Sequence, residues 1–399
     1  MREEVYIVEG VRTAIGKIGG ALKDIMADQL AEHVITGLLG RTEESVEVDE
    51  VILGQSRQSG DAANIARVAS LRAKLPVEVT AYTVHRQCGS GLQAINNAAQ
   101  QIALGINDVI IAGGTESMSN APFYLRNARY GLGVGNNTLY DSNTESQVNS
   151  QPVDQYGVLT MGYTAENLAE KYKISREAQD EFALRSQELA SKAISEGYFN
   201  QEILPYEIKT RKAAVQIATD EHPRSTSLEL LAKLKPVFKE GGTVTAGNSS
   251  GRNDGASALL LMSGEKLQQY GLTPKVKIIA QAVSGVSPEI MGIGPVKSTE
   301  KALKVAGLSL NEIDLIELNE AFAAQSLAVI QELNLDLEKV NVNGGAIALG
   351  HPIGATGAIL MTKLMNELIR RNGKYGLVTL CIGGGQGITT IVENCRYVS

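Results

Sequence analysis

Short apolar runs alternate along the chain with longer amphipathic segments. Strands buried on both faces read as nearly continuous apolar runs, and five such runs lie at residues 5–8, 51–53, 109–112, 315–318 and 377–382. Helical patterns lie between and after them, at residues 28–39, 92–104, 176–196 and 358–370. The alternation predicts an α/β fold and favours a largely parallel sheet with right-handed crossovers.

Two stretches, residues 88–114 and 351–385, share one order of features. Each has a loop of small residues, then a helix, then a strand and a glycine turn. In the first stretch the strand is expected to end at Gly113 and Gly114, and in the second at Cys381, just before three glycines. The repeated order indicates two related halves that face one another.

Composition excludes several classes of protein. The 399 residues correspond to two or three domains of about 150 residues each. A net charge of −7 argues against nucleic acid as the main partner, because phosphate binding needs a basic face. The longest apolar run, 258–262, is too short to cross a bilayer, and the first residues enter a strand pattern at once, without a targeting segment. Three widely spaced cysteines suggest no disulfide framework, so we expect a cytoplasmic protein with no membrane contact.

One stretch is basic on this acidic chain. Residues 209–239 contain seven basic and three acidic side chains, a local charge of +4. A solvated surface explains this pattern, and so does a landing site for a phosphate-bearing small molecule.

Cys88 lies where a small-residue loop passes into an amphipathic helix. The helix pattern uses Leu92, Ile95, Ala99 and Ile102 as one apolar stripe. A helix N-terminus carries partial positive charge and free N–H donors, which can lower a thiol pKa from about 8.5 to about 3.5–7.5. A buried structural cysteine is the alternative interpretation.

His351 and Cys381 are the other two candidates for chemistry. The segment 343–357 around His351 is rich in glycine, which lets backbone approach a ligand closely. Cys381 ends a strand and meets the glycines of 383–387, whose N–H groups are free to bind an oxyanion. No pair of residues has the close spacing of zinc ligands, so we expect no metal. One thiolate could attack a carbonyl with an imidazole as its base, while the other thiol moves a proton on and off carbon.

Together these motifs resemble the thiolase family of acyl-CoA acyltransferases over essentially the whole chain. Five segments carry the resemblance, namely 88–91, 247–251, 319–322, 350–352 and 381–385. The resemblance implies a fold of two similar five-stranded mixed-sheet halves, in αβαβα layers, with an inserted loop domain. It divides the chain into a catalytic half at 1–119 plus 244–264, a CoA-binding loop domain at 120–243, and a second catalytic half at 265–399.

The resemblance also implies catalytic roles. Cys88 becomes acylated, and His351 takes its proton. Cys381 protonates the departing acetyl-CoA enolate in thiolysis and removes an α-proton in condensation. One oxyanion site uses the N–H groups of Cys88 and Gly383, and the other uses His351 with a water held by Asn319.

Substrate contacts follow from the same resemblance. CoA lies against the loop domain, with Arg224 near the adenine and phosphates and Ser250 at the pantetheine. The channel and the acyl pocket are lined mainly by apolar residues, which are Phe238, Ala246, Ala321 and Phe322 for the channel and Met161 and Met291 for the pocket. The expected reaction converts two acetyl-CoA to acetoacetyl-CoA and CoA, reversibly, with CoA as a substrate and no other cofactor. A homodimer or homotetramer is expected by analogy.

Three positions depart from the family's usual pattern. His85 and Gln87 stand where Asn and Leu usually precede the nucleophile. His85 is either a polar substitute in the same turn or an added titrating group near Cys88. Thr160 replaces the histidine that short-chain biosynthetic members carry, which weakens a strict preference for acetoacetyl-CoA.

Other functions remain open from the sequence. One is a 3-ketoacyl-CoA thiolase of broader chain length in fatty-acid degradation. A condensing enzyme of the ketoacyl synthase type uses two histidines with its cysteine, and Cys381 argues against it. The last is a non-catalytic relative that binds acyl-CoA or lipid.

Overall fold

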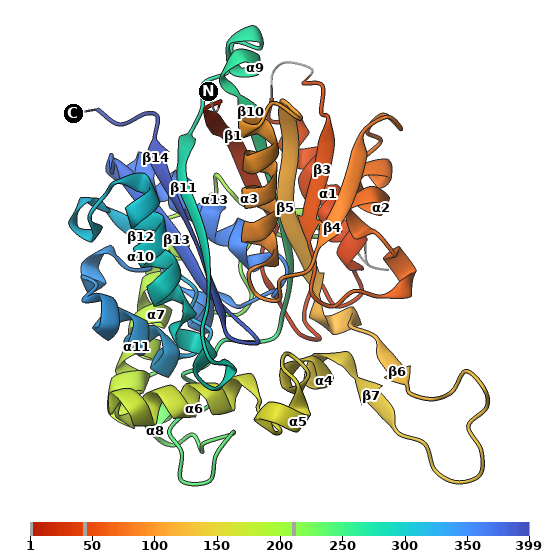
Figure 1. The fold of residues 1–399 in the computed structure, drawn as a ribbon, viewed down its shortest axis with the longest axis vertical. Helices are drawn as coiled ribbons and strands as arrows, with labels where there is room; N and C mark the ends of the chain where they lie inside the picture. Colours follow the sequence, from red (N-terminus) through yellow and green to blue (C-terminus); the bar gives the residue numbers. More distant parts are fainter. Residues whose placement is uncertain (1–2, 43–45, 210–212, 399) are drawn as a thin grey trace.

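One mixed sheet runs through the centre of the computed structural model, which describes residues 3–42, 46–209 and 213–398 (Figure 1). In order across the sheet, the strands are β12 (Leu315–Leu318), β13 (Tyr375–Ile382), β14 (Gln386–Asn394), β11 (Val276–Gly285), β1 (Val5–Arg12), β10 (Asn253–Ser263), β5 (Val109–Ser117), β3 (Glu50–Gly54) and β4 (Thr80–Val84). A short strand, β2 (Gly16–Lys17), also pairs with β10. The five strand runs read from the sequence all lie in this sheet.

The sheet consists of two halves that meet at β1 and β11. Only two residue pairs join these strands, Tyr6 with Lys277 and Ile7 with Val276. Neighbouring strands are antiparallel on both sides of this junction and parallel only near the outer edges, in β12–β13 and β5–β3–β4. The expectation of a largely parallel sheet is therefore wrong. In β13–β14 the reason is direct, because a short glycine turn joins antiparallel strands and cannot make a parallel crossover.

The second half has four strands and one bridge where five strands were expected. Val340 makes a single parallel bridge to Ile316 of β12. The next residue, Asn341, has a φ of +48°, which takes the backbone out of the extended conformation. Its side chain replaces the missing ladder by accepting from the Leu318 N–H at 2.9 Å and donating to the Leu318 carbonyl at 2.8 Å.

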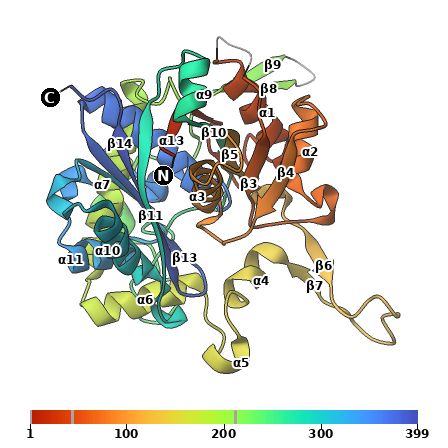
Figure 2. The same cartoon turned by 45° about the horizontal axis from the view of Figure 1, so that its top comes forward.

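Helices fill the layers on both sides of each half. The helices α3 (Ser90–Ala103) and α13 (Thr356–Arg371) share one apolar core with strands from both halves. Two further pairs cover the outer faces, with α1 (Ala27–Leu39) and α2 (Ile65–Arg72) on the first half and α10 (Gly294–Ala306) and α11 (Ala323–Leu333) on the second. The order of layers is αβαβα, as the resemblance implies (Figures 1 and 2).

The segment between β5 and β10 passes along both halves. Its elements are β6 (Phe123–Leu125), β7 (Leu139–Asp141), α4 (Ser142–Val148), α5 (Val153–Tyr156), α6 (Met161–Tyr172), α7 (Arg176–Ser195), β8 (Tyr206–Lys209), β9 (Ala214–Ile217) and α8 (Leu228–Ala232). Within the described ranges, none of its residues forms an apolar core without the halves, since Phe182 packs with the second half and Ile208 with the first. The three-domain division stays a prediction.

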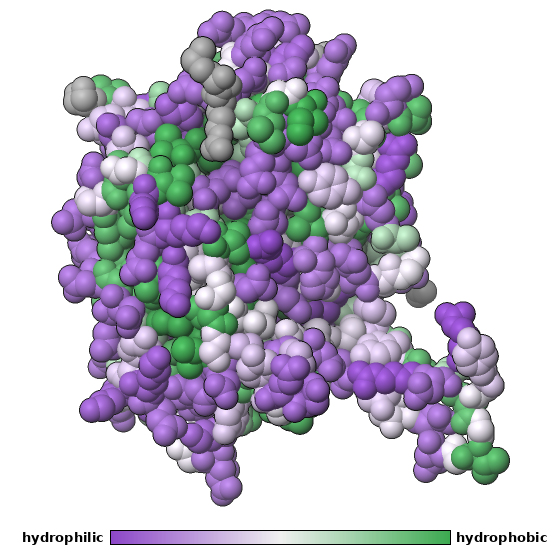
Figure 3. Space-filling view, in the orientation of Figure 1, coloured by the Kyte–Doolittle hydropathy of each residue, from purple (hydrophilic) through white to green (hydrophobic). Residues whose placement is uncertain are grey.

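A hairpin formed by β6 and β7 projects from the body of the molecule (Figures 1 and 2). Its tip carries fully exposed Tyr130 and Val134. In the space-filling view this arm ends in a patch of apolar surface (Figure 3). Among the described residues, no helix combines the length and the apolar content needed to cross a membrane.

The structure extends one strand beyond its predicted end. β5 continues through Gly113 and Gly114 to Ser117, pairing with β10 throughout, so no turn forms at the two glycines. Their role is close packing, because a Cβ on Gly114 would lie 2.1 Å from the Gly354 carbonyl oxygen. The helix over 176–196 is confirmed as α7, with Ser175 accepting from the Ala178 N–H at 3.1 Å.

The described part of the basic stretch 209–239 packs against both halves of the molecule. Lys209 lies at the end of β8, which packs beside α1. Lys233 follows α8, whose Leu231 packs into the core of the second half. Arg211 and Lys212 lie outside the described residues. The interpretation of this stretch as a phosphate landing site stays a prediction, as does the role of Arg224.

Candidate active site

Cys88 is held by a strained turn at the start of α3. Gln87, directly before it, has a φ of +45°, a left-handed conformation that is costly for a residue with a side chain. The Ser90 hydroxyl fixes the turn by accepting from the Arg86 N–H at 2.8 Å and donating to the Gln87 carbonyl at 2.6 Å. The turn places the thiol at the helix N-terminus, as the sequence predicts.

Two glycines let the second half approach this turn. A Cβ on Gly91 of α3 would lie 2.8 Å from the Gly354 carbonyl oxygen. A Cβ on Gly357 of α13 would lie 2.3 Å from the Leu92 nitrogen. Only glycine permits contacts this short, since real Cβ atoms essentially never approach backbone within 3.0 Å. The close approach brings the loop that carries His351 beside the thiol.

The hydrogen bonds of His351 define its tautomer. Its Nδ1 lies 2.6 Å from the Thr356 hydroxyl, and that hydroxyl donates to the Pro352 carbonyl at 2.9 Å. A hydroxyl has one proton to donate, so both contacts are satisfied together only when Thr356 accepts from His351 Nδ1–H. The Nε2 lone pair is then free, and Nε2 is buried without a protein partner. His351 is therefore arranged to accept a proton at Nε2.

Electrostatics keep this imidazole neutral. Burial, with a smaller contribution from the positive charge of Arg57, lowers the pKa of His351 to about 4. At neutral pH the ring is unprotonated and available as a base. The side chain is only 6% exposed, which explains the strength of the effect.

The pKa of the Cys88 thiol differs from the prediction made from the sequence. Burial raises the pKa of its thiol above the ordinary value, and the charge of Arg57 and the Gly383 N–H offset this only in part. Desolvation of the thiolate therefore outweighs these two contributions, and the pKa moves in the direction opposite to the expected lowering. Cys88 is a thiol at neutral pH and needs a base to become a nucleophile.

Cys381 lies at the end of β13, buried beside Cys88. It shares an apolar cluster with Met291 and Phe322, and its thiol has no exposed surface. Burial raises its pKa strongly, and a charge on Cys88 would raise it further. The thiol is thus held in the protonated form that a proton donor requires.

Backbone donors follow Cys381 directly. Gly384 and Gly385 have φ values of +87° and +88°, and they turn the chain from β13 into β14. Gly383 is closely packed, since a Cβ there would lie 3.1 Å from the Ser150 hydroxyl and 3.3 Å from the Met161 sulfur, and both side chains would have to shift by a few tenths of an ångström. Its N–H hydrogen-bonds toward Cys88. The Gly383 N–H therefore lies where it can stabilise charge on the oxygen of an acyl group attached to the Cys88 sulfur.

Asn319 follows β12 and is completely buried. Its backbone N–H donates to the Thr379 carbonyl at 3.0 Å. Both polar atoms of its side chain, Oδ1 and Nδ2, lack a protein partner. Buried polar groups of this kind ordinarily bind ordered water, which is the role that the resemblance gives to Asn319.

A cavity of about 270 Å³ unites most of the predicted residues. Those that line it are Cys88, Met161, Phe238, Ser250, Met291, Ala321, Phe322, His351 and Gly383. Four predicted residues do not line it, and these are Ala246, Arg224, Asn319 and Cys381. Cys381 and Asn319 lie buried behind the wall, whereas Arg224 is exposed and donates to the Ala246 carbonyl at 3.2 Å.

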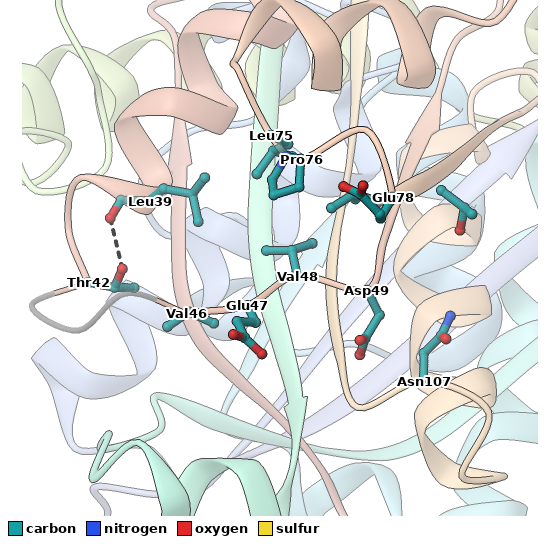
Figure 4. A pocket seen from close by; sticks show the side chains of 12 residues that line it. Leu39, Thr42, Val46, Glu47, Val48, Asp49, Leu75, Pro76, Glu78 and Asn107 are labelled. Carbon is teal, nitrogen blue, oxygen red and sulfur yellow. Dashed lines mark hydrogen bonds between the residues drawn. The ribbon is translucent and has the colours of Figure 1, made fainter.

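A larger hollow of about 960 Å³ lies beside α1 and β4 (Figure 4). Its wall carries the carboxylates of Glu47, Asp49 and Glu78, which the close-up shows, but no cysteine or histidine among the described residues that line it. The Asp49 carboxylate is already engaged, accepting from the N–H groups of Asp108 and Val109. The smaller cavity is therefore the candidate active site, although it is not the largest.

Apolar side chains form one side of the smaller cavity. The rings of Phe238 and Phe322 meet edge to face with centroids 5.9 Å apart. Ser250 is tied to this wall by its N–H, which donates to the Ala321 carbonyl at 3.0 Å. Such a wall suits the thioester end of a pantetheine arm.

The sequence analysis missed the polar side of the cavity. Arg57, Asn143, Ser146, Gln147 and Arg252 also line it. Arg57 comes from the loop after β3, whereas Asn143, Ser146 and Gln147 lie in α4. The segment 120–160 has little periodicity, so no sequence pattern identifies these residues. An arginine directly after the 247–251 motif was the one available signal.

The three departures have structural explanations. Gln87 accepts from the Ser56 hydroxyl at 3.0 Å and donates to the Ser150 hydroxyl at 3.2 Å, so it supports the turn before Cys88. Thr160 caps α6, its hydroxyl accepting from the Tyr163 N–H at 3.2 Å. His85 is exposed and does not line the cavity, which favours its interpretation as a polar substitute.

Comparisons with known proteins agree with this geometry. Residues 5–265 match the thiolase N-terminal domain, and residues 272–394 match the thiolase C-terminal domain. The chain belongs to the thiolase family. It is 51% identical to the acetyl-CoA acetyltransferase of Pseudomonas aeruginosa, over 97% of this chain and 98% of that one. It is 48% identical to the human mitochondrial 3-ketoacyl-CoA thiolase, over 98% of both chains.

Solved structures confirm the fold class. The crystal structure of the Bacillus anthracis acetyl-CoA acetyltransferase superimposes with a TM-score of 0.95 at 49% identity, covering 98% of this chain and 99% of that one. The human mitochondrial 3-ketoacyl-CoA thiolase in complex with CoA gives a TM-score of 0.93 at 47% identity and 98% coverage of both. This chain is an acyltransferase of acyl-CoA metabolism with thiolase activity, that is, Claisen condensation and thiolysis.

Proposed function

We propose that this chain is an acetyl-CoA C-acetyltransferase, which converts two acetyl-CoA to acetoacetyl-CoA and CoA and catalyses the reverse thiolysis. The observation that carries the proposal is a single cavity lined by Cys88 and His351, with Cys381 buried beside Cys88. Acetyl-CoA, acetoacetyl-CoA and CoA are its substrates, and the scheme needs no resident cofactor.

In thiolysis the first step forms an acyl-enzyme. His351 Nε2 takes the proton of Cys88, and the sulfur attacks the C3 carbonyl of acetoacetyl-CoA. The C2–C3 bond then breaks, and its electron pair passes to C2 of the departing acetyl-CoA. Cys381 gives that carbon its proton. The raised pKa of the Cys381 thiol supports this role, because the thiol stays protonated until carbon needs it.

The second step releases the acyl group. The Cys381 thiolate takes the proton of a CoA thiol, and the CoA sulfur attacks the thioester on Cys88, whose sulfur regains its proton from His351 as it leaves. The carbon–sulfur bond to Cys88 breaks, and acetyl-CoA leaves. Condensation is the same sequence in reverse, with the Cys381 thiolate removing an α-proton from the second acetyl-CoA.

Two sites stabilise the oxyanions that form on the way. The Gly383 N–H, directed toward Cys88, supports one site together with the Cys88 N–H. The side chain of Asn319, buried and without protein partners, supports a water that acts with His351 at the other. Removal of one such donor typically costs a factor on the order of 10²–10³ in rate.

CoA is proposed to enter along the apolar side of the cavity. Phe238 and Ser250 line this side, and Arg224 is exposed near Ala246. That position suits an arginine that meets the phosphates outside the channel. The relative solved with CoA supports CoA as the ligand class.

A broader 3-ketoacyl-CoA thiolase is the second candidate. Met161 and Met291 line the cavity, and an apolar wall discriminates each extra methylene by only about 1–3 kcal/mol. Relatives of almost equal identity carry both names. Thiolysis rates across a series of 3-ketoacyl-CoA lengths decide between the candidates. A steep fall beyond four carbons supports the acetyltransferase, and a flat profile overturns it.

Intact-protein mass after mixing with acetyl-CoA tests the mechanism. The expected result is one added acetyl group that Cys88→Ala abolishes. Binding without a covalent gain would instead indicate a non-catalytic carrier. A requirement for a malonyl thioester would indicate a condensing synthase.

Assembly and location complete the proposal. We infer a homodimer or homotetramer, supported by the apolar tip of the projecting β6–β7 hairpin, and light scattering measures the mass that decides it. A cytoplasmic location is supported by three cysteines that are all free thiols.

A further inference from the structure

Arg57 lies in a loop that packs against both catalytic turns. The loop follows β3, and a Cβ on Gly54, the last residue of that strand, would lie 2.4 Å from the backbone at the start of α3. From the other half, a Cβ on Gly354 would lie 2.7 Å from Gln55 Cα. Gly354 belongs to the loop that carries His351, so the loop of Arg57 is held between that loop and the turn before α3. The mechanism proposed above gives this arginine no role.

Hydrogen bonds fix the guanidinium of Arg57 relative to the Cys88 sulfur. Its Nε donates to Asn143 Oδ1 at 3.3 Å, and its Nη1 donates to the Ser56 hydroxyl at 2.9 Å. That hydroxyl in turn donates to Gln87 Oε1 at 3.0 Å. Gln87 is the left-handed residue directly before Cys88. A chain of hydrogen bonds therefore runs from the guanidinium to the turn that presents the thiol.

Arg57 is also short of counter-charge. It is only 7% exposed, and both of its side-chain partners are neutral. In the described part of the chain, no carboxylate forms an ion pair with its guanidinium. Burial lowers the pKa of Arg57, although the negative charges around it oppose this. A buried charge without a charged partner is costly, and negative charge that forms beside Arg57 during the reaction supplies the missing partner.

The carboxylates near Arg57 are engaged elsewhere. Glu116 accepts from three backbone N–H groups at 2.9–3.0 Å, which are those of Ser56, Arg57 and Gly354. Asp141 accepts from the Asn143 N–H at 2.9 Å and lies 3.9 Å from the exposed Arg252. The charged and titratable groups that face Arg57 and Cys88 are Glu116 of β5, Asp141 of β7, Arg252 before β10, Cys381 of β13, His351 and the exposed His85. Of these charges, Arg57 acts most strongly on Cys88, and Glu116 opposes it less strongly.

One positive charge therefore acts on both members of the proton-transfer pair. Burial raises the pKa of the Cys88 thiol, and the charge of Arg57 is the largest effect in the opposite direction. Burial lowers the pKa of His351 to about 4, and here the charge of Arg57 adds to the effect. An opposite charge nearby favours the ionised form of a group, and a like charge disfavours it. Arg57 thus favours a thiolate at Cys88 and an uncharged ring at His351.

We propose that Arg57 is an electrostatic positioning residue of the catalytic pair, whose charge favours the thiolate of Cys88 and keeps His351 neutral. The inference rests on the proposed function for its use in the reaction. In the first step of thiolysis, the guanidinium balances the negative charge that the Cys88 sulfur carries between losing its proton and attacking the carbonyl. In the second step, Arg57 makes the imidazolium of His351 a stronger acid, which favours return of its proton to the departing sulfur. Arg57 itself exchanges no proton.

Alkylation of Cys88 by iodoacetamide, without any acyl-CoA, tests the effect on the thiol. Mass spectrometry of the digested protein separates Cys88 from the other two cysteines. Arg57→Met removes the charge and is expected to lower the alkylation rate of Cys88 at pH 8 about 10-fold, the lower end of the effect of a nearby opposite charge. The pH at which alkylation is half-maximal should rise in the same variant.

The pH profile of acylation tests the effect on the imidazole. The measurement is the rate at which the protein gains an acetyl group at saturating acetyl-CoA. The rate of the native chain should fall on the acid side near pH 4, where His351 becomes protonated. In Arg57→Met this fall should move toward pH 6.5, because the repelling charge is gone.

Further variants separate charge from hydrogen bonding. Arg57→Lys keeps the charge and should keep both pH profiles close to those of the native chain. Arg57→Gln keeps a donor for the Ser56 hydroxyl without the charge, so it should behave like Arg57→Met, and it takes the place of that variant if Arg57→Met does not fold. Arg72→Met is the matched control, since Arg72 pairs with Asp28 outside the cavity and should leave both profiles unchanged.

The pattern of shifts decides the inference. Removal of one positive charge raises the pKa of every nearby group, so shifts of the two profiles in opposite directions would overturn it. Recovery of the native profiles in Arg57→Gln but not in Arg57→Lys would assign Arg57 a structural role instead. An unchanged alkylation profile in Arg57→Met would show that the charge does not act on Cys88. If Cys88 alkylation depends on Arg57 but the native chain gains no acetyl group, the proposed function fails while the electrostatic coupling stands.

Discussion

The turns that precede α3 and α13 occupy equivalent places in the two halves, yet they present side chains of different chemistry. The first turn reaches its left-handed backbone with Gln87, held by hydrogen bonds to Ser56 and Ser150. The second reaches it with Gly350, whose φ is +107°. The first presents a thiol whose pKa burial raises, and the second presents an imidazole whose pKa burial lowers.

The comparison shows how one kind of environment favours opposite proton states. Burial disfavours whichever form of a group is charged. It therefore keeps Cys88 protonated and His351 unprotonated, which is the pair that a proton transfer from sulfur to nitrogen requires. Each group alone is unreactive at neutral pH, and only the packing of α3 against α13 makes the pair useful.

The largest expected effect comes from replacing each of the two cysteines in turn. Cys88→Ala should abolish acylation and reduce thiolysis by a factor on the order of 10⁴–10⁶, the cost of losing a nucleophile. Cys381→Ala should still be acylated by acetyl-CoA, because that exchange breaks no carbon–carbon bond. Intact mass and thiolysis rates measure the two steps separately. Equal acylation of both variants would contradict the assigned roles.

The next effect concerns the orientation of His351. Thr356→Val removes the acceptor of the Nδ1 proton, so the free lone pair is no longer fixed at Nε2. We expect kcat for thiolysis to fall about 10²-fold or more, within the range of general-base contributions. Thr356→Ser keeps the hydroxyl and should restore most of the rate. A uniform loss in both variants would show that packing, and not the tautomer, is what Thr356 supplies.

A smaller effect tests the contact between the two turns. Gly357→Ala places a Cβ 2.3 Å from the Leu92 nitrogen, and the two helices must separate. We expect a loss of about 1–3 kcal/mol in the free energy of unfolding, together with slower acylation of Cys88. Denaturant titration measures the free energy of unfolding. The rate at which the protein gains the mass of an acetyl group from acetyl-CoA measures the acylation of Cys88. Gly60→Ala is the control, since a Cβ there meets nothing within 4 Å.

An effect of similar size is a dependence of stability on pH. The pKa of His351 is lowered to about 4 in the folded chain and returns to about 6.5 on unfolding. Below pH 6.5 the unfolded state therefore binds a proton that the folded state refuses, and stability falls until about pH 4. The full difference is about 3 kcal/mol. The pKa of His222 is also lowered to about 4, so His222 too makes stability fall as the pH decreases through this window. His351→Asn should flatten the slope in this window, and an unchanged slope would contradict the burial of His351.

Much of the fold is readable from the sequence, and the failures are instructive. The strand runs and the helix over 176–196 follow from periodicity, which is a local property. The direction of strands is not local, so the pairing of β10 between β1 and β5 was missed. The glycines of β5 read as a turn, because sequence does not distinguish a glycine that turns from one that permits close packing.

The candidate site divides in the same way. Cys88, His351 and Cys381 lie in motifs whose residue types indicate their chemistry. Arg57 and Ser146 come from segments without periodicity, the loop after β3 and α4, and only the tertiary structure brings both to the cavity. Even the direction of the Cys88 pKa shift was wrong from sequence, because a helix start is visible there and burial is not.

The sequence by itself determined the family, the order of layers and the three groups that exchange protons, since these depend on residue types at short spacing. Only the tertiary structure decided which proton states those groups hold and which side chains complete the cavity. The physical reason is that desolvation and close packing arise between segments hundreds of residues apart, where no local pattern records them.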